Sequence, residues 1–524
     1  MGDREDSGPV LAAVVPDPSR AAEDPVAAGH AADPAPRAAA DATVLSGRVA
    51  RGVSWTAFNR LTGQAVQFGA GIVLARLLTP ADYGTMASVY VITGFAVLLF
   101  ELGLGSVVVA LRDPTDRDLC TVFWLNALSG VAFAGVLAGA GPLVAAFFGD
   151  PRMAALTPLV GLPFLLGIGG VHNGLLQRRL RFRTASLVGL AATTAGIVAT
   201  VVAALLGLGV YALVTGPVVA SIVYTALSWA AVPWRPRHFI SRESLPRIWA
   251  FAGGQLGFNA VNYWGRNGDN FFIGRFVGQA SLGLYGKAYS LMLLPVQQVG
   301  QVLGEVMFPA LAAMGRDQER VARGYRRAVG LINVVTVPVL VGLAAVAPGL
   351  VPFLWGDQWL GTVPLLMILC FAGVPQCLAA SVGWLFQSQN RTGLMFRVGL
   401  VSSSGGLVLI AVGVFAAGAT GVAVAVLVQA WISLLPTLHY ACGLVGLRAR
   451  TVLAGNLRLF AVCGVMFAVV WTLPVLLDAN RRTAWVAGLQ VVVGAVVFLA
   501  LGALVLRPQL DDLRRTVLRR GVTG

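Results

Sequence analysis

The 524-residue chain is 57% hydrophobic and only 12% charged, with a mean hydropathy of +0.78. This composition excludes a water-soluble globular protein, and no segment between the apolar stretches is long enough for a soluble catalytic domain. The net charge of +15 would suggest nucleic acid as the partner of a soluble protein. Here, 26 of the 38 basic residues fall in segments expected on one side of a membrane and six on the other, which predicts cytosolic termini instead.

The first 47 residues differ in composition from the rest of the chain. They are rich in proline, alanine and aspartate and lack apolar periodicity, which predicts a disordered cytosolic tail. The apolar patch Val10 to Val15 is too short for a signal peptide, so the first spanning helix is expected to act as the insertion signal.

Apolar stretches of about 20 residues, long enough to cross a hydrocarbon core, recur from Trp55 almost to Arg507. They predict an all-α polytopic membrane protein with about 14 transmembrane helices. The predicted spans are 52–78, 85–111, 119–148, 154–177, 184–207, 210–232, 248–276, 282–313, 328–354, 361–386, 394–417, 419–445, 455–477 and 485–506. The two longest connections, 233–247 and 315–327, are both expected in the cytosol.

An internal repeat divides these helices. Residues 76–84 match residues 275–283 at a constant offset of 199, and weaker matches follow at offsets of 210 and 212. Each repeat holds six helices, an even number, so the repeats are expected to be parallel about an axis along the membrane normal. The predicted parts are a tail (1–47), an N-terminal six-helix bundle (48–240), a C-terminal six-helix bundle (241–447), two extra helices (448–506) and a basic cytosolic tail (507–524). Paired bundles favour alternating access, although a duplicated scaffold is the alternative.

Polar side chains follow one face of the predicted helix 248–276. Gln255, Asn259, Asn262, Arg266 and Asp269 (or its neighbour Asn270) recur at steps of three and four residues. The predicted helix 52–78 carries a similar stripe, in which the offset of 199 pairs Arg60 with Asn259 and Gln67 with Arg266. The substrate-binding candidates are Arg60, Gln64, Gln67, Asn259, Asn262, Arg266, Asp269 and Gln301, and the candidates for ion coupling are Glu101 and Glu305.

These polar residues have two interpretations. Charged and amide groups in a membrane usually face a cavity. These residues therefore predict a cavity lined by the spans 52–78, 85–111, 248–276 and 282–313, with Arg60 near its inner end. An arginine never loses its proton and its fork of donors matches phosphate oxygens, so Arg60 and Arg266 could anchor a diphosphate. Alternatively, Arg60 pairs with Glu101 and Arg266 pairs with Asp269, and these pairs only hold helices together.

Several other signals favour structural roles. Asp116-Arg117-Asp118 has the form of a sugar-transferase metal motif but lies in a short loop without a nucleotide-binding fold. His172 is interpreted as a hydrogen-bonded structural histidine rather than a proton carrier. The five cysteines fall in apolar segments without metal-ligand spacing, so we expect core residues, no metal and no cofactor.

Several motifs resemble those of one transporter family. These motifs are 76–84, Glu101-Leu102-Gly103-Leu104-Gly105-Ser106, 176–182, 269–275 and Val306-Met307-Phe308-Pro309-Ala310-Leu311. They resemble the Wzx-type polysaccharide flippases of the multidrug, oligosaccharidyl-lipid and polysaccharide exporter superfamily, in the lipopolysaccharide or teichuronic acid branch. The resemblance covers about residues 48–450.

The resemblance implies a flippase that moves an undecaprenyl-diphosphate-linked oligosaccharide across the plasma membrane by alternating access, without ATP hydrolysis, for cell-surface polysaccharide biosynthesis. The implied partners are the lipid-linked oligosaccharide, membrane lipids, and a polysaccharide polymerase and glycosyltransferases, with no nucleic acid. A cation-coupled multidrug antiporter of the same superfamily is one alternative, although Arg60 and Arg266 disfavour it. Two further alternatives are a membrane enzyme, either a glycan polymerase or a ligase, and a purely structural assembly subunit.

Overall fold

The computed structural model describes residues 63–100, 108, 114–166, 168–241, 256–315 and 317–505. The described residues all belong to one compact unit. The predicted N-terminal tail and the basic C-terminal tail therefore lie outside the described residues.

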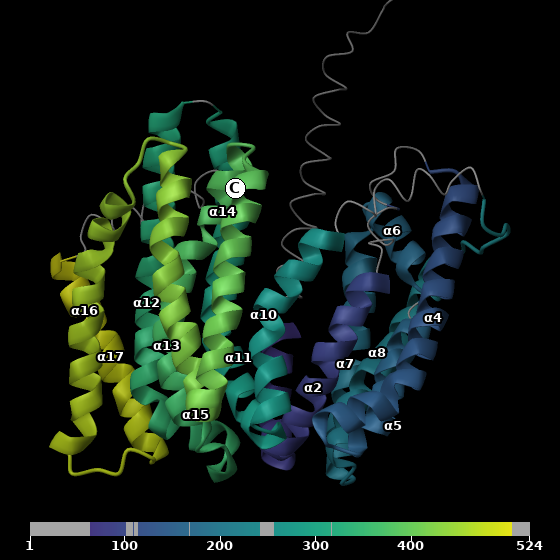
Figure 1. Cartoon of the computed structure of the whole chain (residues 1–524), viewed down its shortest axis with the longest axis horizontal. Helices are drawn as coiled ribbons and strands as arrows, with labels where there is room; N and C mark the ends of the chain where they lie inside the picture. The colour runs from purple at the N-terminus through teal and green to yellow at the C-terminus, as the bar shows by residue number, and fades with distance from the viewer. Residues whose placement is uncertain are drawn as a thin grey trace, which may run out of the picture. The chain divides into compact units, whose positions relative to one another are not determined.

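The described residues form helices and short connections, with no strand among them. Residues 63–77 are helical. The remaining elements of the first half are α2 (Pro80–Phe100), α4 (Asp116–Phe148), α5 (Arg152–Leu166), α6 (Gly170–Arg178), α7 (Phe182–Leu205), η1 (Gly209–Tyr211) and α8 (Ala212–Ala231). The second half contains α10 (Leu256–Phe276), α11 (Gln279–Ala313), α12 (Gln318–Trp355), η3 (Asp357–Trp359), α13 (Thr362–Ala380), α14 (Val382–Ser388) and α15 (Thr392–Gly443), followed by α16 (Ala449–Leu476) and α17 (Ala484–Val505) (Figure 1).

The predicted class, an all-α polytopic membrane protein, is confirmed. Within the described part of the chain, 8 helices are long and apolar enough to cross a membrane, or 9 if the bent pair α5 and α6 forms one span. The number of about 14 stays a prediction, because the beginning of the first predicted span and most of residues 101–113 are not described.

The 52-residue helix α15 is a helical hairpin rather than one span. Its backbone leaves the helical region at Ala417 and at Gly418, where φ is 57°. Gly413 and Gly421 then approach so closely that a Cβ on either would collide with the backbone of the other. The break separates the two spans predicted at 394–417 and 419–445.

The connection predicted at 315–327 is shorter than expected. Helix α12 begins at Gln318, because the Asp317 side chain caps it by accepting a hydrogen bond from the N–H of Arg320 at 3.1 Å. The arginines of this connection lie on the first turns of the helix, where long basic side chains can extend to the aqueous boundary. The helix therefore begins ten residues before the span predicted at 328–354.

Helices α2 and α11 cross in close contact near their N-terminal ends. A Cβ on Gly84 would collide with the carbonyl oxygen of Gln279, and a Cβ on Gly283 would collide with that of Pro80. Both pairs of positions, 84 with 283 and 80 with 279, differ by 199, the offset of the repeat. The contact is therefore reciprocal, as an approximate two-fold axis between duplicated halves requires, and it supports the predicted duplication.

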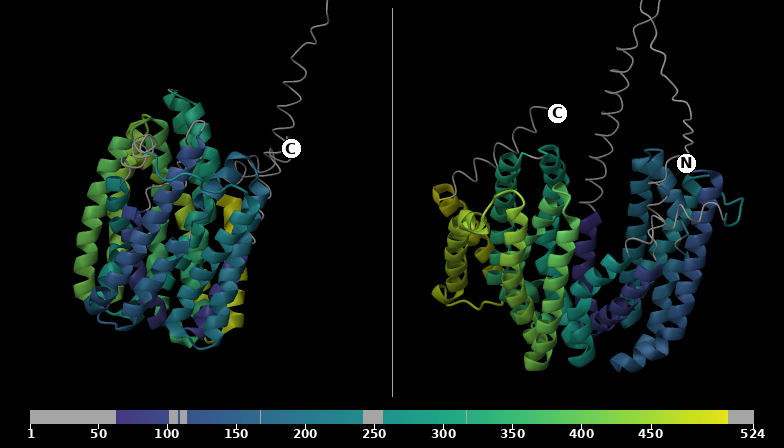
Figure 2. Two further views of the ribbon diagram at one scale, coloured as in Figure 1. Left: turned by 90° about the vertical axis from the view of Figure 1, so that its right-hand side faces the viewer. Right: turned by 45° about the horizontal axis from the view of Figure 1, so that its top comes forward.

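Helices α12 and α13 form the centre of the second half. Buried apolar residues such as Leu340 of α12 and Leu366 of α13 run through both helices, whereas Val491 and Val496 of α17 are exposed. The extra helices α16 and α17 lie along the outer side of α12 (Figures 1 and 2). A buried amide pair joins α16 to α12, in which Asn333 Nδ2 donates to Asn456 Oδ1 at 3.0 Å.

Candidate functional site

A polar cavity of about 240 Å³ lies within the second half, among α10, α11, α13 and α15. Two of the predicted site residues line it, Arg266 with an exposed side chain and Asp269 in a buried position. Its other polar lining residues are Tyr289, Gln376, Ser402, Ser403, Gln429 and Ser433. The cavity thus combines one cation with amide and hydroxyl groups inside an apolar bundle.

Helix α10 places Arg266 and Asp269 on one face because they are three residues apart. Small residues on its neighbouring positions let α10 approach α15. A Cβ on Gly265 would lie 2.8 Å from Ser403 Oγ, and one on Gly268 would collide with the Leu407 side chain. This close packing holds the polar face of α10 against the hairpin α15.

The carboxylate of Asp269 has its own partners. Its Oδ2 accepts a hydrogen bond from the Tyr285 hydroxyl at 2.7 Å, and its Oδ1 accepts one from the N–H of Asn270 at 2.8 Å. The structure gives no ion pair between Arg266 and Asp269, although both side chains are described. The alternative in which Arg266 merely pairs with Asp269 therefore has no contact to support it.

The other predicted site residues do not line this cavity as far as the structure describes them. Gln64 is half-buried and Gln67 exposed in the helical segment 63–77, and Gln301 is exposed on α11. The remaining candidates fall on positions of which the structure describes nothing, or nothing beyond the backbone: Arg60, Glu101, Asn259, Asn262 and Glu305. Their assignment stays a prediction.

The polar residues of α13 and α15 were not among the predicted site residues. Gln429 Nε2 donates to the carbonyl oxygen of Ser402 at 3.0 Å and lies 3.3 Å from its hydroxyl, which joins the two arms of the α15 hairpin. Gln376 contributes from α13. Each is an isolated amide in an apolar span, which is a weaker signal than the stripe on α10 but follows the same rule that polar groups in a membrane face a cavity.

A second set of contacts, here called the closure, joins the two halves where α2 and α11 begin. Arg76 donates to the carbonyl oxygens of Phe353 at 2.6 Å and Leu354 at 3.1 Å, at the end of α12. In return, Trp359 Nε1 donates to the carbonyl oxygen of Ala75 at 2.7 Å. The closure thus connects the end of the first predicted helix to the connection after α12.

Lys287 of α11 completes the closure. Its Nζ lies 4.2 Å from the ring centroid of Tyr83, 5.4 Å from that of Trp355 and 5.7 Å from that of Trp359. Tyr83 belongs to the first half and the two tryptophans to the second. A cation enclosed by aromatic faces is attracted by their ring quadrupoles, so Lys287 stabilises the contact between the halves.

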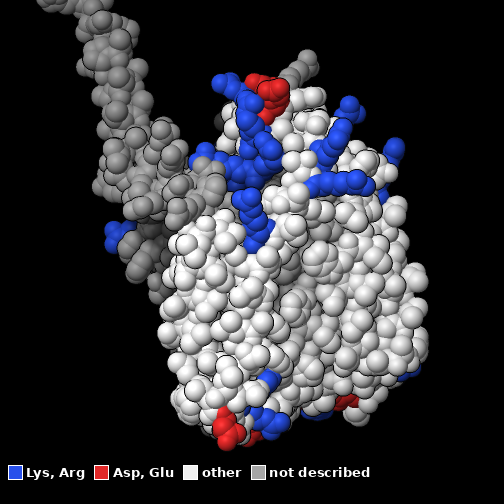
Figure 3. Space-filling model, turned by 90° about the vertical axis from the view of Figure 1, so that its left-hand side faces the viewer, with Lys and Arg blue, Asp and Glu red and all other residues white. Residues whose placement is uncertain are grey.

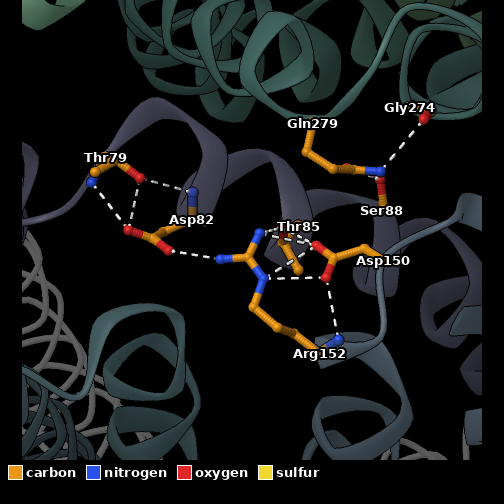
Figure 4. A network of polar contacts seen from close by, with 8 residues as sticks. All are labelled: Thr79, Asp82, Thr85, Ser88, Asp150, Arg152, Gly274 and Gln279. Atoms are coloured by element: carbon orange, nitrogen blue, oxygen red, sulfur yellow. Dashed lines mark hydrogen bonds and ion pairs between the residues drawn. The ribbon is translucent and has the colours of Figure 1, made fainter.

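Next to the closure, ionic side chains connect the start of α2 with the α4–α5 connection (Figure 4). Arg152 lies 2.9 Å from Asp150 and 3.2 Å from Asp82. Burial raises the pKa of the Asp150 carboxyl, but hydrogen bonds from Arg152 and Thr85 and the charge of Arg152 outweigh it, so that this pKa lies below its ordinary value. Asp150 is therefore ionised at neutral pH. In the same region, Ser88 of the first half donates to Gln279 of the second at 2.7 Å.

The residues interpreted as structural have structural partners. Thr115 and Asp118 form a capping box at the start of α4, which gives Asp118 a role other than metal binding. His172 is buried, stacks on Trp229 and lies 3.2 Å from the carbonyl oxygen of Trp234. All five cysteines are buried and unpaired by disulfides. The described residues contain no group of His, Cys, Asp and Glu able to hold a metal ion.

The family model described as "Polysaccharide biosynthesis protein" matches residues 73–364, more than half of the chain. The chain belongs to this family. The teichuronic acid biosynthesis protein TuaB of Bacillus subtilis is 26% identical over 391 residues, which are 74% of this chain and 80% of TuaB. The lipopolysaccharide biosynthesis protein WzxC of Escherichia coli is 24% identical over 71% of this chain and 76% of WzxC. The succinoglycan biosynthesis transport protein ExoT of Rhizobium meliloti is 28% identical over 63% of this chain and 67% of ExoT.

Solved structures share the fold of this polysaccharide biosynthesis family member. The lipid II flippase MurJ in an inward closed conformation has a TM-score of 0.66 at 14% identity, covering 87% of this chain and 99% of MurJ. A multidrug resistance MATE family transporter in an inward-facing conformation has a TM-score of 0.56 at 15% identity, covering 73% of this chain and 95% of that one. The predicted kinship with the polysaccharide biosynthesis proteins of the teichuronic acid and lipopolysaccharide type is thus confirmed.

Proposed function

We propose that this protein is a flippase that moves an undecaprenyl-diphosphate-linked oligosaccharide from the cytosolic to the outer leaflet of the plasma membrane for cell-surface polysaccharide biosynthesis. The family and the names of TuaB, WzxC and ExoT support polysaccharide biosynthesis, and the name of ExoT supports transport. The shared fold of the lipid II flippase MurJ supports a lipid-linked cargo.

Arg266 is the observation that carries this proposal. Its guanidinium lines a cavity inside an apolar bundle, and the nearby carboxylate of Asp269 is bound to Tyr285 and to the backbone instead. A cation is costly in a membrane interior unless it serves a ligand or a partner. The fork of donors on arginine fits the oxygens of a diphosphate, while the amides and hydroxyls of the cavity suit sugar hydroxyls.

The two bundles, 48–240 and 241–447, are the moving parts in this proposal. The closure holds them together at the end where α2 and α11 begin, which the charge distribution assigns to the outer face. Cargo would enter from the cytosolic end while the closure is intact. Opening of the closure would then release it outside. Arg60, Gln64, Gln67, Asn259, Asn262 and Gln301 are proposed to extend the cargo site, with Glu101 and Glu305 as candidates for ion coupling.

Two alternatives fit the observations less well. A cation-coupled multidrug antiporter would favour an acidic or aromatic cavity, whereas this cavity presents Arg266 and engages the carboxylate of Asp269 with Tyr285. A polymerase or ligase would need acid and base groups at an outer site, but Asp82 and Asp150 are engaged with Arg152. A polymerase and glycosyltransferases are proposed as partners that supply and consume the cargo.

Depletion of the protein tests the proposal directly. Lipid-linked glycan should accumulate on the cytosolic leaflet while its synthesis continues, and purified protein in liposomes should move a defined fluorescent lipid-linked oligosaccharide between leaflets. If depletion stops glycan synthesis itself, the protein is an enzyme of assembly and the flippase proposal is wrong.

A further inference from the structure

A second cavity, separate from the one at Arg266, lies between the start of α12 and the start of the extra helix α16. Its volume is about 540 Å³. It is lined by Arg323, Arg326, Arg327, Gly330, Leu331, Thr451, Val452, Ala454, Gly455 and Asn456. None of these residues lines the Arg266 cavity. Figure 3 shows basic side chains gathered at this end of the flank formed by α12, α16 and α17, with a wide uncharged surface beneath them.

Helical spacing brings the cationic groups together. Arg323 is followed by Arg326 and Arg327 at steps of three and four residues, so the three guanidinium groups project from neighbouring positions of α12. Glu319 pairs with Arg323 at 3.0 Å, but both side chains are largely exposed, 86% and 60%, and such a pair is weak. No acidic residue is part of the cavity lining that the structure describes. The charged residues of the described lining are therefore all basic.

Helix α16 supplies the opposite wall and leaves it open. Thr451 and Gly455 are four residues apart, and a Cβ on Gly455 would meet no atom within 4 Å. Deeper in the cavity, Asn456 is 4% exposed and bonded to Asn333, whose Oδ1 is buried and has no hydrogen-bond partner. The cavity thus has arginines at its rim, an unfilled space at Gly455 on the facing helix, and the amide groups of Asn456 and Asn333 at its base.

We propose that this cavity binds the phosphate headgroup of an anionic phospholipid in the leaflet at this end of the molecule. Basic pockets between spanning helices bind such headgroups, and arginine forks match phosphate oxygens. The extra helices also carry exposed apolar side chains, with Leu457 66% exposed on α16 and Val496 60% exposed on α17. These side chains fit the acyl chains of a lipid. Under the topology of the proposed function, on which this inference rests, the leaflet is the cytosolic one.

The proposal assigns a role to the two extra helices, which lie outside both repeats. Without α16, the arginines of α12 would face an open surface, and no wall would hold a headgroup against them. The transported lipid also carries phosphate, but the cavity lies on the α16 side of α12, whereas the proposed cargo site is enclosed by α10, α11, α13 and α15. A resident phospholipid therefore fits this position better than cargo.

Lipid binding to the full-length protein in a neutral detergent tests this. Native mass spectrometry should show phosphatidylglycerol retained at least about tenfold more strongly than phosphatidylcholine with the same acyl chains, and the preference should weaken as salt is raised.

The triple variant Arg323→Gln, Arg326→Gln, Arg327→Gln should lose this preference. The matched triple Arg179→Gln, Arg181→Gln, Arg237→Gln removes exposed arginines from the first half and should keep it. Gly455→Leu, which fills the cavity without changing charge, should also weaken binding, and an unchanged melting temperature in lipid-free detergent would show that each variant is folded.

Three outcomes would overturn the proposal. If both triple variants lose the preference equally, the attraction is that of general surface charge. If inorganic phosphate competes as strongly as phosphatidylglycerol, the site is for a free anion. If undecaprenyl diphosphate binds there in preference to phosphatidylglycerol, the occupant is cargo. The flippase proposal fails separately, through the Arg266 variants, which leave this cavity intact.

Discussion

Arg266 and Asp269 share one face of α10, yet their contacts differ. Asp269 is buried and accepts hydrogen bonds from Tyr285 and from the backbone, whereas Arg266 is exposed at the cavity. Removing one member of a buried ion pair strands the charge of its partner, and removing both relieves the conflict. Asp269 and Arg266 do not form such a pair, because the Asp269 carboxylate accepts its side-chain hydrogen bond from Tyr285. Replacing Arg266 should therefore not leave the carboxylate without a partner.

Replacing Arg266 tests the anchor assignment. Arg266→Gln should leave folded protein at near-normal abundance in the membrane and reduce export by about 10- to 100-fold, the scale of one lost charge-assisted interaction. Adding Asp269→Asn should not restore export, while Arg266→Lys should retain part of it because lysine keeps the charge and loses the fork. Export and membrane abundance are measured together. If the double variant recovers both export and membrane abundance, Arg266 has a structural role and does not anchor cargo. The same comparison, with Arg60→Gln and Glu101→Gln, tests whether the inner end of the predicted cavity also holds cargo.

The Asp150 carboxylate makes a pH-dependent contribution to stability. Its pKa in the folded protein lies below the ordinary value of 3.8, so the stabilisation is fully present above that value and is lost as the pH falls through the lowered pKa. Melting curves in detergent should therefore show that Asp150→Asn is less stable than the wild type at pH 6, by about 1 kcal/mol, because Arg152 is partly exposed. The two should converge only as the pH falls below 3.8, through the lowered pKa of Asp150. Asp357→Asn, the same change at an exposed position, is the control, and a constant difference across this range would contradict the prediction.

At the scale of single residues, the sequence predicted the polar face of α10 and a cavity beside it, but not that α13 and α15 line this cavity. The stripe on α10 is visible because its members recur at helical spacing. Gln376, Ser402 and Gln429 stand alone among apolar residues, so their meeting depends on how α13 and α15 pack, which no spacing encodes. For the same reason, the bond between Asp269 and Tyr285 could not be predicted from the motif around Asp269.

Among the helices, the contact between α2 and α11 depends on two glycines. Because a Cβ on Gly84 or Gly283 would collide with backbone, which cannot move aside as a side chain can, the helices would have to separate. The repeat offset relates the two glycines to each other. Symmetric close contact of this kind is how small residues permit helices to pack in a membrane.

Alanine substitutions test this crossing. Gly84→Ala and Gly283→Ala should each lower membrane abundance or transport, since overpacking costs about 1–3 kcal/mol even where side chains alone must adjust. Gly286→Ala on the same helix is the matched control, because a Cβ there would meet no atom within 4 Å. Immunoblots of membrane fractions and an export assay provide the readout. Wild-type behaviour of all three variants would show that the helices do not cross as described.

Helix boundaries were predictable where a local signal exists. The break in α15 falls at Gly418, whose positive φ suits glycine, between two spans already separated in the sequence. The start of α12 was missed because the predicted span covered only the apolar segment 328–354, whereas Asp317 caps a helix that extends beyond that segment. Composition locates the membrane core, but a cap decides where the helix begins.

In the molecule as a whole, the closure joins the two halves at the end where α2 and α11 begin. Trp359 is fully buried, and it both donates a hydrogen bond to Ala75 and packs edge-on against Tyr83 of the other half. A contact between rigid bundles biases the equilibrium between the two states of a transporter by the free energy that it contributes to one of them. Weakening the closure should therefore favour the state that is open at this end.

A tryptophan substitution measures that bias. Trp359→Phe removes the N–H donor and part of the packing, worth about 1 kcal/mol, and should raise the open population about five- to tenfold. A reporter cysteine, Ser88→Cys, is buried against Gln279 in the closed state and should become more reactive to a membrane-impermeant thiol reagent, in a background without native cysteines. Trp485→Phe, at a 60% exposed position, is the control. An unchanged labelling rate in folded Trp359→Phe would contradict a gating role for the closure.

The orientation of the molecule is the prediction on which the direction of transport depends. Helix α12 has 38 residues and, at about 1.5 Å per residue, is roughly 57 Å long, which exceeds a bilayer of about 40–45 Å including its headgroups. Its two ends must therefore lie on opposite sides of the membrane. The beginning carries Arg320, Arg323, Arg326 and Arg327, and the end leads to the closure, so the positive-inside rule places the beginning in the cytosol.

Single cysteines at Ser241, Gln318 and Asp357, in a background without native cysteines, decide this orientation. Cysteines at Ser241 and Gln318 should react with an impermeant reagent only after the cells are opened, and a cysteine at Asp357 should react in intact cells. Because Gln318 and Asp357 flank one continuous helix, equal labelling of both from either side would contradict a spanning α12. Complete reversal would keep the fold but place the closure in the cytosol and the basic α12–α16 cavity outside, which would reverse the proposed direction of cargo entry.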